Sequence, residues 1–544
     1  MLASLILCSI QAQTVVAFKL NMKALVDKNL FQPSNNEKIF IRGSFNNWNG
    51  DDYELNDENT DRYYRGVFKI DVGIEDTLEY KFVIKKNDGR YYWEKNPDPL
   101  NPNYGNRKLI ISSDTIILPE AAFSYDEYIK YPVIFRKEKL REDFIQMRRA
   151  LEENHPALYD YTGKKILDSL FDFSYTLLDT NMEFNKFYKI TSSALERVGC
   201  GHTKLWIPSE YWNSAPQRFF PLKLIFIKNK AYVCGYYTTT KNILLGSEIV
   251  EINGKPIEEI INSLISVTSS DAFIRAFKLK TVEKNFSPGY ALYYDYPEYF
   301  KIKFVLPGES ETRESIIIPA DGKTISKNPT RGNKLTLKLY DNNRIAVLTI
   351  NSFIYYDRLN MFRSFIDSSF REIKTHDIKN LILDLRGNDG GDPFCSSYLL
   401  SYIENKPVPY FAEPYGRYEE LAEPIPRARN NFKGNLFTLI DGSGFSTTGH
   451  FCALLKFHKI GKLVGTETGA TYTCTGSVQY LNLKNTGIIF GTARKHRYSA
   501  AVKNMDRSRG ILPDYQVEKT PGDIISNKDV EMDFVLDLIK NNSE

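Results

Sequence analysis

Residues 381–391 read LILDLRGNDGG, and residues 437–450 read FTLIDGSGFSTTGH. Each stretch begins with a short apolar run, continues into a turn of glycines or small residues, and is followed by a segment of helical character. Apolar runs of this length, each followed by a helix, are typical of buried parallel strands that carry functional loops at their carboxyl ends. The two stretches therefore predict an α/β core with a site built from two neighbouring turns.

These two turns hold the residue types that attack on a carbonyl requires. Gly387, Gly390 and Gly391 can adopt positive φ and direct backbone N–H groups toward one point. We predict an oxyanion hole formed by the N–H of Gly390 or Gly391 and the N–H of Thr447. Ser446, on the second turn, is placed to act as a nucleophile. The structural alternative is a glycine-rich turn in which Ser446 only caps a helix.

Three motifs, DLRGNDGG, SGFSTTGHF and GILPDY, together resemble those of the carboxyl-terminal processing (tail-specific) serine peptidases and their tricorn-core relatives. The resemblance covers about residues 124–538 and implies a ClpP/crotonase-like α/β serine peptidase core over residues 335–544, with Ser446 as the nucleophile. Two positions depart from the family pattern. Asp389 replaces a glycine, and Gly449 stands where many members have glutamate.

The serine needs a base, because an unperturbed hydroxyl is a poor nucleophile. Some tail-specific peptidases carry a lysine within G-K-G-S-V-Q, and the matching segment here is TYTCTGSVQ, with Cys474 or Thr475 in the lysine's place. The missing lysine favours a Ser–His–acid mechanism. His202, in GCGHT ahead of a predicted strand, resembles the base histidine of tricorn-like members. The alternative is a histidine with a structural role.

The resemblance also implies an acid shortly before GILPDY, which makes Asp506 the first choice and Asp514 the second, with Glu467 as a third. His155 precedes a proline at a predicted helix end, and His450 lies within the helix after the nucleophile, so both are interpreted as structural. No HExxH or similar ligand spacing occurs among the six histidines. We therefore expect no metal and no cofactor.

The amino-terminal part carries a second resemblance. Residues 14–118 alternate in polarity, and GSFNNW and YKF resemble elements of the immunoglobulin-like starch- and glycogen-binding modules. This implies a β-sandwich in which Trp93, Tyr91 and Tyr92 form a platform that stacks on sugar rings. The alternative is that Trp93 packs inward and closes the edge of the sandwich.

Residues 1–13, MLASLILCSIQAQ, form an apolar run that ends in small residues. This pattern predicts a secretory signal peptide and an exported protein, whether periplasmic, on the outer surface or secreted. Cys8 raises the alternative of a lipoprotein, although Leu7 is large for the position before a lipidated cysteine. No other apolar stretch approaches 18 residues, so we expect no transmembrane segment.

The middle of the chain divides into two further parts. Residues 124–215 show helical periodicity, and residues 216–330 contain LLGSEIVEINGKPIEEIINSL, which resembles the strand–turn–helix signature of a PDZ domain. PDZ domains accept a peptide as an added strand. The expected fold is thus multidomain, consisting of a β-sandwich, a helical segment, a PDZ-like domain and an α/β peptidase core.

Composition limits the remaining choices. The chain has 544 residues with a net charge of +4 and no lysine- or arginine-rich block, which gives no indication of nucleic-acid binding. Apart from Cys8, the cysteines are widely and irregularly spaced, which argues against a disulfide framework and a cysteine-based metal site. They are Cys200, Cys234, Cys395, Cys452 and Cys474.

The sequence therefore predicts an exported serine peptidase that hydrolyses peptide or protein chains near their carboxyl termini. The alternative from another class is an inactive peptidase homologue that binds peptides or glycans, for which Asp389 and Gly449 are the only support. An α/β-hydrolase esterase is disfavoured, because GFSTTG does not give the G-x-S-x-G elbow.

Overall fold

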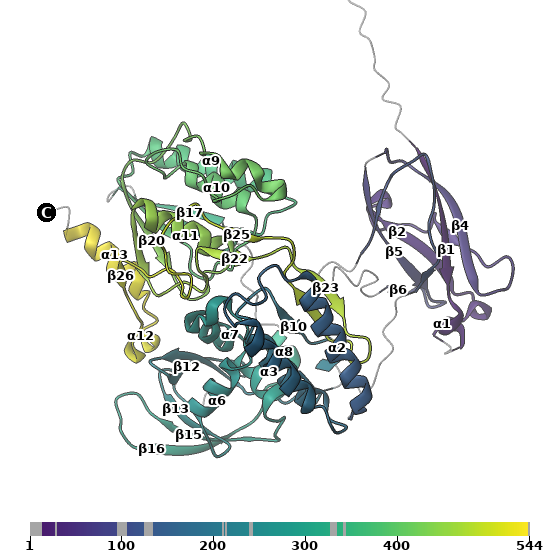
Figure 1. The fold of residues 1–544 in the computed structure, drawn as a ribbon, viewed down its shortest axis with the longest axis horizontal. Coiled ribbons are helices and arrows are strands. Elements are labelled where there is room, and N and C mark those ends of the chain that lie inside the picture. The colour runs from purple at the N-terminus through teal and green to yellow at the C-terminus, as the bar shows by residue number, and fades with distance from the viewer. Residues whose placement is uncertain are drawn as a thin grey trace, which may run out of the picture. The chain divides into compact units, whose positions relative to one another are not determined.

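The computed structural model describes residues 13–27, 30–74, 76–94, 106–123, 134–208, 211–212, 215–238, 243–326, 335–340 and 344–541. The chain forms two compact units (Figure 1). The first comprises residues 1–131 with 480–482, and the second comprises residues 132–479 and 483–544. Residues 1–12 of the predicted signal peptide, Cys8 among them, lie outside the described residues.

The first unit contains two β-sheets that share one apolar core. One sheet has the order β4–β1–β8 with β9 on β1, and the other has the order β3–β2–β5–β6 with β7 on β5. Buried and half-buried residues alternate along β1, so that Phe18 faces inward and contacts Tyr80 of β5, with ring centroids 5.3 Å apart. The elements are β1 (Thr14–Asn21), α1 (Lys23–Asp27), η1 (Pro33–Asn35), β2 (Lys38–Gly43), η2 (Ser44–Asn46), β3 (Glu54–Leu55), β4 (Tyr63–Ile70), β5 (Thr77–Lys85), β6 (Tyr91–Trp93), β7 (Arg107–Ile110), β8 (Thr115–Ile117) and β9 (Ala121–Ala122).

The second unit begins with three helices, α2 (Lys137–Asn154), α3 (Lys164–Thr176) and α4 (Phe184–Glu196). In α2, the buried residues Leu140, Phe144, Met147 and Leu151 recur at spacings of three and four, which forms one apolar stripe. The helix ends before His155, whose extended backbone is what the following proline favours. The short strand β10 (Lys204–Trp206) comes after α4.

An antiparallel sheet with the order β11–β12–β13–β15–β16 follows, with β14 paired to β13. Asn253 and Gly254 both have positive φ and form the tight turn between β13 and β14. Helix α6 buries Ile257, Ile260 and Leu264 against this sheet. The elements are β11 (Leu222–Ile227), β12 (Lys230–Tyr236), β13 (Glu248–Ile252), β14 (Lys255–Pro256), α6 (Ile257–Ile265), η3 (Asp271–Phe273), α7 (Arg275–Tyr293), β15 (Phe300–Val305), β16 (Thr312–Ile317) and α8 (Gly322–Ser326).

The core sheet has the order β17–β18–β19–β20–β21–β26, and its strands are parallel from β18 onward. The apolar runs that opened the sequence analysis form β19 and β20, so their carboxyl ends lie side by side, as predicted. Helices α9, α10 and α11 pack on one face of this sheet and α13 on the other. The elements are β17 (Leu335–Tyr340), β18 (Ile345–Ile350), α9 (Leu359–Thr375), β19 (Asn380–Asp384), α10 (Pro393–Ser401), η5 (Gly416–Ala422), β20 (Asn435–Ile440), α11 (Thr447–His458), β21 (Lys462–Gly465), β26 (Tyr515–Gln516), α12 (Pro521–Ile525) and α13 (Val530–Asn541).

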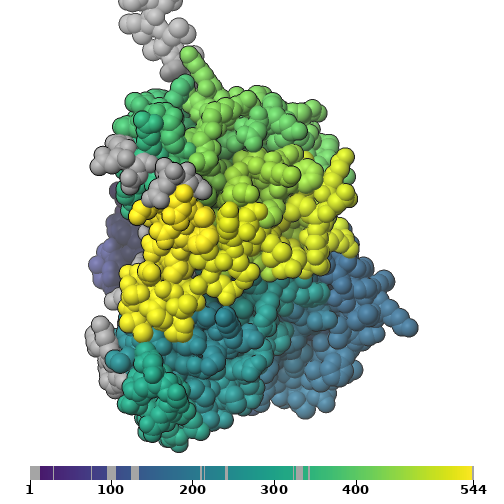
Figure 2. All heavy atoms as spheres, turned by 90° about the vertical axis from the view of Figure 1, so that its left-hand side faces the viewer, coloured from purple at the N-terminus to yellow at the C-terminus, as the bar shows by residue number. Residues whose placement is uncertain are grey.

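Four short strands complete the chain: β22 (Thr473–Thr475), β23 (Gln479–Asn482), β24 (Ile489–Thr492) and β25 (Arg497–Ser499). Strand β24 pairs with β10, which attaches the segment around His202 to the carboxyl-terminal half of the chain. Figure 2 shows the C-terminal residues, in yellow, on the surface between the green core and the teal sheet region. No helix among the described residues is long and apolar enough to cross a membrane.

Candidate active site

Ser446 occupies a sharp turn between β20 and α11. Its backbone has φ 54° and ψ −122°, a conformation that costs a non-glycine residue free energy. The run of small residues before it lets the chain turn this tightly, and the serine is half-buried at the surface of the turn. A strained strand-to-helix turn that exposes a serine hydroxyl is the geometry of a nucleophile elbow.

The glycine loop after β19 lies directly against this elbow. A Cβ placed on Gly390 would lie 2.6 Å from the carbonyl oxygen of Phe445 and 3.0 Å from the Cβ of Ser446. It would also lie 3.1 Å from the nitrogen of Thr447, and φ of Gly390 is +97°. Only glycine fits this position, and its absence of a side chain brings the loop beside the nucleophile.

Two backbone N–H groups at this contact are available to a substrate oxygen. Thr447 is the first residue of α11, where N–H groups have no partner within the helix. The N–H of Gly391 has no hydrogen-bond partner in the described part of the chain. The N–H of Gly390, in contrast, donates to the Oδ1 of Asn388 at 2.9 Å. Of the residues predicted for the oxyanion hole, Gly391 and Thr447 therefore have the free donors.

Asn388 holds the glycine loop in place. Its side chain is fully buried, and its Nδ2 donates to the carbonyl of Ile350 at 2.9 Å. Besides the N–H of Gly390, its Oδ1 accepts the hydroxyl of Thr448 in α11 at 2.8 Å. One amide thus connects β18, the glycine loop and the helix that begins after the nucleophile.

An ion-pair cluster fixes the start of the same loop. The guanidinium of Arg386 donates to both carboxylate oxygens of Asp384, at 2.9 Å each. It also contacts Asp529 and Glu531, the latter at 3.1 Å, which lie at the start of α13. These charges are used in holding the loop to the C-terminal helix.

Cys474 of β22, one of the two residues expected in place of a lysine, lies beside the serine. Its Sγ lies 4.0 Å from the Oγ of Ser446 and 3.5 Å from the Nε2 of His450. Burial raises the pKa of the Cys474 thiol well above its ordinary value and lowers the pKa of His450 to about 4. The two side chains therefore form a neutral thiol–imidazole pair.

His202 contacts the residue that precedes Ser446 in the elbow. Its ring lies against the ring of Phe445, with centroids 4.6 Å apart. Gly201 permits this approach, because a Cβ there would lie 2.6 Å from the Phe445 ring. Desolvation, followed by the positive charge of Lys204, lowers the pKa of His202 to about 3, so the imidazole is neutral at pH 7. A neutral imidazole is the form that can accept a proton.

The three carboxylates predicted as the acid have other partners. Asp506 is exposed and accepts hydrogen bonds from the N–H and hydroxyl of Ser508 at 2.8 and 2.6 Å. Asp514 pairs with a lysine and Glu467 with an arginine. Within the described residues, none of the three makes a hydrogen bond or ion pair with His202.

A different carboxylate, Asp271, lies beside the histidine. Its Oδ1 accepts the N–H of Gly201 at 2.8 Å, and its Oδ2 is buried with no hydrogen-bond partner among the described residues. Donor atoms of Cys200, His202 and Asp271 all lie within 4.8 Å of one another. Burial raises the pKa of Asp271 to about 7. No local sequence signal points to Asp271, because η3 reaches His202 only through the packing of two loops.

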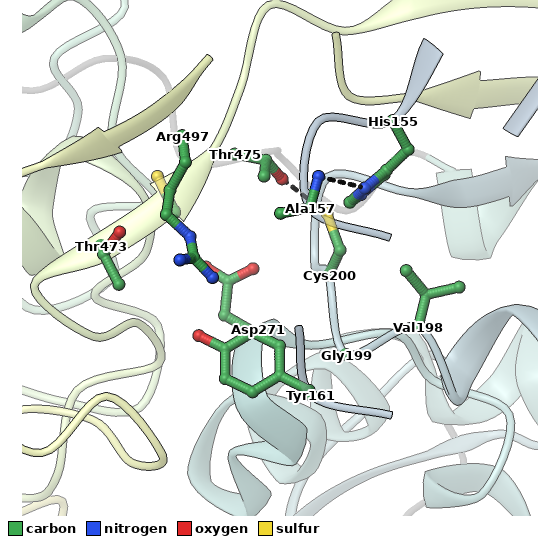
Figure 3. Close-up of a pocket in the computed structure, with 11 residues that line it drawn as sticks. His155, Ala157, Tyr161, Val198, Gly199, Cys200, Asp271, Thr473, Thr475 and Arg497 are labelled. Carbon is green, nitrogen blue, oxygen red and sulfur yellow. Dashed lines mark hydrogen bonds between the residues drawn. The ribbon is translucent and has the colours of Figure 1, made fainter. Parts of the chain in front are cut away.

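Asp271 and Cys200 also line a small cavity of about 10 Å³ (Figure 3). Thr473 and Thr475 of β22 and Arg497 of β25 line it as well. Figure 3 shows the Asp271 carboxylate pointing into this space between the β22–β25 pair and the loop that carries Cys200. A cavity of this size accommodates about one water-sized group.

The two departures from the family pattern leave these contacts intact. Asp389 is exposed on the glycine loop. Gly449 lies in α11, where a Cβ would be 2.7 Å from both the Cβ of Ala470 and the carbonyl oxygen of Thr471. The helix therefore packs so closely on the loop after β21 that a glutamate has no room at this position.

Comparison with known proteins identifies the core. Residues 344–517 match the model of peptidase family S41. The chain is a serine peptidase. The match covers β18 to β26 and includes the glycine loop and the elbow with Ser446. No curated protein matches the chain by sequence.

The chain is also similar to solved structures, and the two with TM-scores above 0.5 support this fold. Mature CPAF complexed with lactacystin is 14% identical with a TM-score of 0.53, and the alignment covers 75% of this chain and 98% of that one. Mature CPAF alone is 15% identical with a TM-score of 0.52, covering 75% and 99%. The photosystem II D1 C-terminal processing protease is 14% identical, covers 70% and 93%, and has a TM-score of 0.36.

The first unit carries an aromatic surface on its second sheet. Trp48 and Trp93 are half-buried, with ring centroids 6.3 Å apart, and neither belongs to the apolar core. The guanidinium of Arg42 lies over the Tyr91 ring at 4.0 Å, and the Tyr91 hydroxyl donates to Asp51 at 3.0 Å. The predicted platform residue Trp93 therefore pairs with Trp48.

Proposed function

We propose that this chain is an exported peptidase that cleaves peptide bonds by a Ser–His–acid mechanism, with Ser446 as nucleophile and His202 as base. The observation that carries the proposal is the meeting of three loops at Phe445 and Ser446: the strained elbow, the glycine loop and the histidine loop. Export rests on the composition of residues 1–13.

The proposed reaction follows ordinary acyl transfer. As the Oγ of Ser446 attacks the substrate carbonyl carbon, His202 takes the hydroxyl proton, and the carbonyl oxygen becomes negatively charged. The N–H groups of Gly391 and Thr447 stabilise that oxygen. His202 then returns its proton to the departing amine, and a water molecule repeats the sequence on the acyl-enzyme.

For the acid we propose Asp271 in place of Asp506. The support is proximity to the imidazole, because a carboxylate stabilises the imidazolium only when it lies next to it. The backbone N–H of Gly201 holds one oxygen of Asp271 and leaves the other directed into the site. Comparing Asp271→Asn with Asp506→Asn tests this choice. We expect kcat to fall at least about 100-fold in the first variant and to stay within about threefold in the second. The reverse result would favour Asp506 as the acid.

A fluorophosphonate probe tests the nucleophile. We expect covalent labelling of the wild-type chain and none of Ser446→Ala. The matched control is Ser443→Ala, which removes a buried hydroxyl from the same turn and should leave labelling unchanged. Absence of labelling in a folded wild-type chain would favour the alternative of an inactive homologue that binds peptides.

Action near carboxyl termini is proposed through the sheet region of residues 216–330. Its antiparallel sheet with two packed helices supports the PDZ-like interpretation, and such domains bind a peptide end as an added strand. The expectation is faster cleavage of a peptide with a free carboxylate than of the same peptide amidated at that end. Equal rates would remove carboxyl-terminal capture from the proposal.

A second candidate function is glycan binding by an immunoglobulin-like first unit. The supporting observation is the pair of half-buried tryptophans, Trp48 and Trp93, outside the core, since flat aromatic faces stack on sugar rings. We expect the full chain to be retarded in affinity electrophoresis through glycogen and Trp93→Ala to lose this retardation. Equal migration of both proteins would leave Trp93 with a structural role only.

A further inference from the structure

The group formed by Cys200, His202 and Asp271 holds three different metal-ligating side chains around one point, with donor atoms within 4.8 Å of one another. We propose that this group is a Zn²⁺ site, and that bound zinc occupies His202 and inhibits the peptidase. The proposal that zinc binds here is argued from the geometry alone. The proposal that bound zinc inhibits rests on the proposed role of His202 as the base.

Two atoms of this group have no hydrogen-bond partner among the described residues. One oxygen of Asp271 is held by the Gly201 N–H at 2.8 Å, whereas its Oδ2 is buried and unpartnered there. The same is true of the buried Nδ1 of His202 within the described part of the chain. Leaving buried polar atoms unsatisfied is costly, and a cation between them removes that cost.

The chemistry of the donors fits zinc. Zn²⁺ binds thiolate, imidazole and carboxylate in tetrahedral sites, with bonds of roughly 2.0–2.3 Å that place neighbouring donors about 3.4–3.8 Å apart. Small side-chain rotations bring atoms within 4.8 Å to that spacing. One thiolate and one carboxylate balance the two positive charges, and the fourth position is left for water. Calcium and magnesium favour all-oxygen sites instead.

Binding is an exchange of a proton for the metal. The S–H bond of Cys200 breaks, an S–Zn bond forms, and the proton passes to solvent, with no change in oxidation state. The Oγ1 of Thr475 lies 2.9 Å from the sulfur and can donate its hydroxyl hydrogen to the thiolate. This hydrogen bond supports the anionic form of the ligand from outside the metal's own shell.

The surrounding structure fixes two of the ligands before metal arrives. The N–H of Ala272 donates to the carbonyl of Gly199 at 3.0 Å, which holds η3 to the loop that carries Cys200. Cys200 and Asp271 are both buried, with 4% and 2% of their surfaces exposed. The positive charge of Lys204 opposes a cation nearby, so we expect weaker binding than at structural zinc sites.

Cobalt is the direct probe of such a site. Addition of Co²⁺ to the metal-free wild-type chain should produce a sulfur-to-cobalt charge-transfer band and the visible absorption of tetrahedral Co²⁺, and Zn²⁺ should abolish both. Cys200→Ser should lose the charge-transfer band and bind Zn²⁺ at least about tenfold more weakly in calorimetry. The matched control is Cys234→Ser, which removes an exposed cysteine and should leave the spectrum unchanged.

Inhibition is measured separately. Each variant's peptidase activity with added Zn²⁺ is divided by its own activity in a chelator, so that a change in basal rate does not enter. We expect Zn²⁺ to remove most of the wild-type activity. The fraction of its own activity that Cys200→Ser loses should be at least about tenfold smaller.

The two measurements separate the site from its effect. A wild-type chain without the charge-transfer band, or a Cys200→Ser variant with an unaltered spectrum, would overturn the metal site. If Cys200→Ser does not fold, Asp271→Asn in the cobalt titration tests the same ligand set. Zinc that binds as expected without inhibiting would retain the site but contradict His202 as the base.

Discussion

Removing the amide of Asn388 should disable the glycine loop. Asn388→Ala deletes three hydrogen bonds at once and leaves the Ile350 carbonyl, the Gly390 N–H and the Thr448 hydroxyl buried without partners. Each buried hydrogen-bonding group left without a partner lowers the free energy of unfolding, and we take about 1–2 kcal/mol for each. Three such groups amount to about 3–6 kcal/mol of lost stability, less whatever a water molecule in the vacated space restores.

The effect on activity follows from the position of the loop. With Asn388 absent, the Gly390 N–H loses its acceptor and the glycine loop loses its link to the Thr448 hydroxyl. The N–H of Gly391 is then held only by the bonds that the Gly390 and Gly391 carbonyls accept from Phe353 and Thr447, so its direction is less fixed. Loss of one oxyanion donor costs about 10²–10³ in kcat. We therefore expect Asn388→Ala to lower kcat on a peptide substrate by about 100-fold or more with little change in KM, since this contact strengthens only in the transition state.

Two measurements test this reasoning together: denaturant unfolding and steady-state kinetics of the same preparation. The control is Asn388→Asp, whose retained oxygen can still accept from Gly390 and Thr448 but whose other oxygen meets the Ile350 carbonyl. It should lose stability yet keep more activity than Asn388→Ala. A folded Asn388→Ala variant with wild-type kcat would refute the claim that this amide positions the oxyanion donors.

Three further predictions concern other parts of the chain. Gly390→Ala should lower kcat at least about 100-fold, because its Cβ would lie 2.6 Å from the Phe445 carbonyl oxygen; kinetics at wild-type level would contradict it. Burial raises the pKa of Glu404 to about 7, above its value in the unfolded chain, so the stabilising protonated form is lost as pH rises through 7. Glu404→Gln should therefore match wild type in denaturant unfolding at pH 4 and exceed it by roughly 1–3 kcal/mol at pH 8. Trp93→Ala should lower the free energy of unfolding by under about 1 kcal/mol, whereas Phe82→Ala, in the core of the same unit, should lower it by about 3–5 kcal/mol. Equal losses of both variants in denaturant unfolding would place Trp93 in the core.

Local patterns predicted the framework of the site. The apolar runs of β19 and β20 allow only buried strands, and parallel pairing then brings the two turns that follow them to one edge of the sheet. The glycines of the first turn and the small residues of the second are required by the close contact between Gly390 and Ser446. Such steric requirements act over a few residues, and they can therefore be predicted from the sequence.

Contacts between distant loops could not be predicted in the same way. Asp271 reaches His202 because Gly201 donates its N–H to that carboxylate. The stretch SSDAF contains no pattern that predicts a contact between Asp271 and the loop of His202. The same holds for the metal-ligating group, since spacing rules detect ligands only on one helix or turn. The resemblance favours Asp506 by its position before GILPDY, which gives its place along the chain but not the direction of its side chain.

Because the lysine expected after the nucleophile is missing, the proposed base has to come from another part of the chain. Cys474, one of the two residues in the matching segment, lies beside the serine, but its raised pKa keeps the thiol protonated, and an S–H group cannot take a proton from Ser446. His450 contacts the sulfur of that cysteine and the ring of Phe411, and its ring makes no hydrogen bond to Ser446 among the described residues. His202 is the imidazole that lies against Phe445, the residue before the serine, with Asp271 next to it. We therefore propose His202, on the loop before β10, as the base, and the pairing of β10 with β24 attaches that loop to the carboxyl-terminal half of the chain.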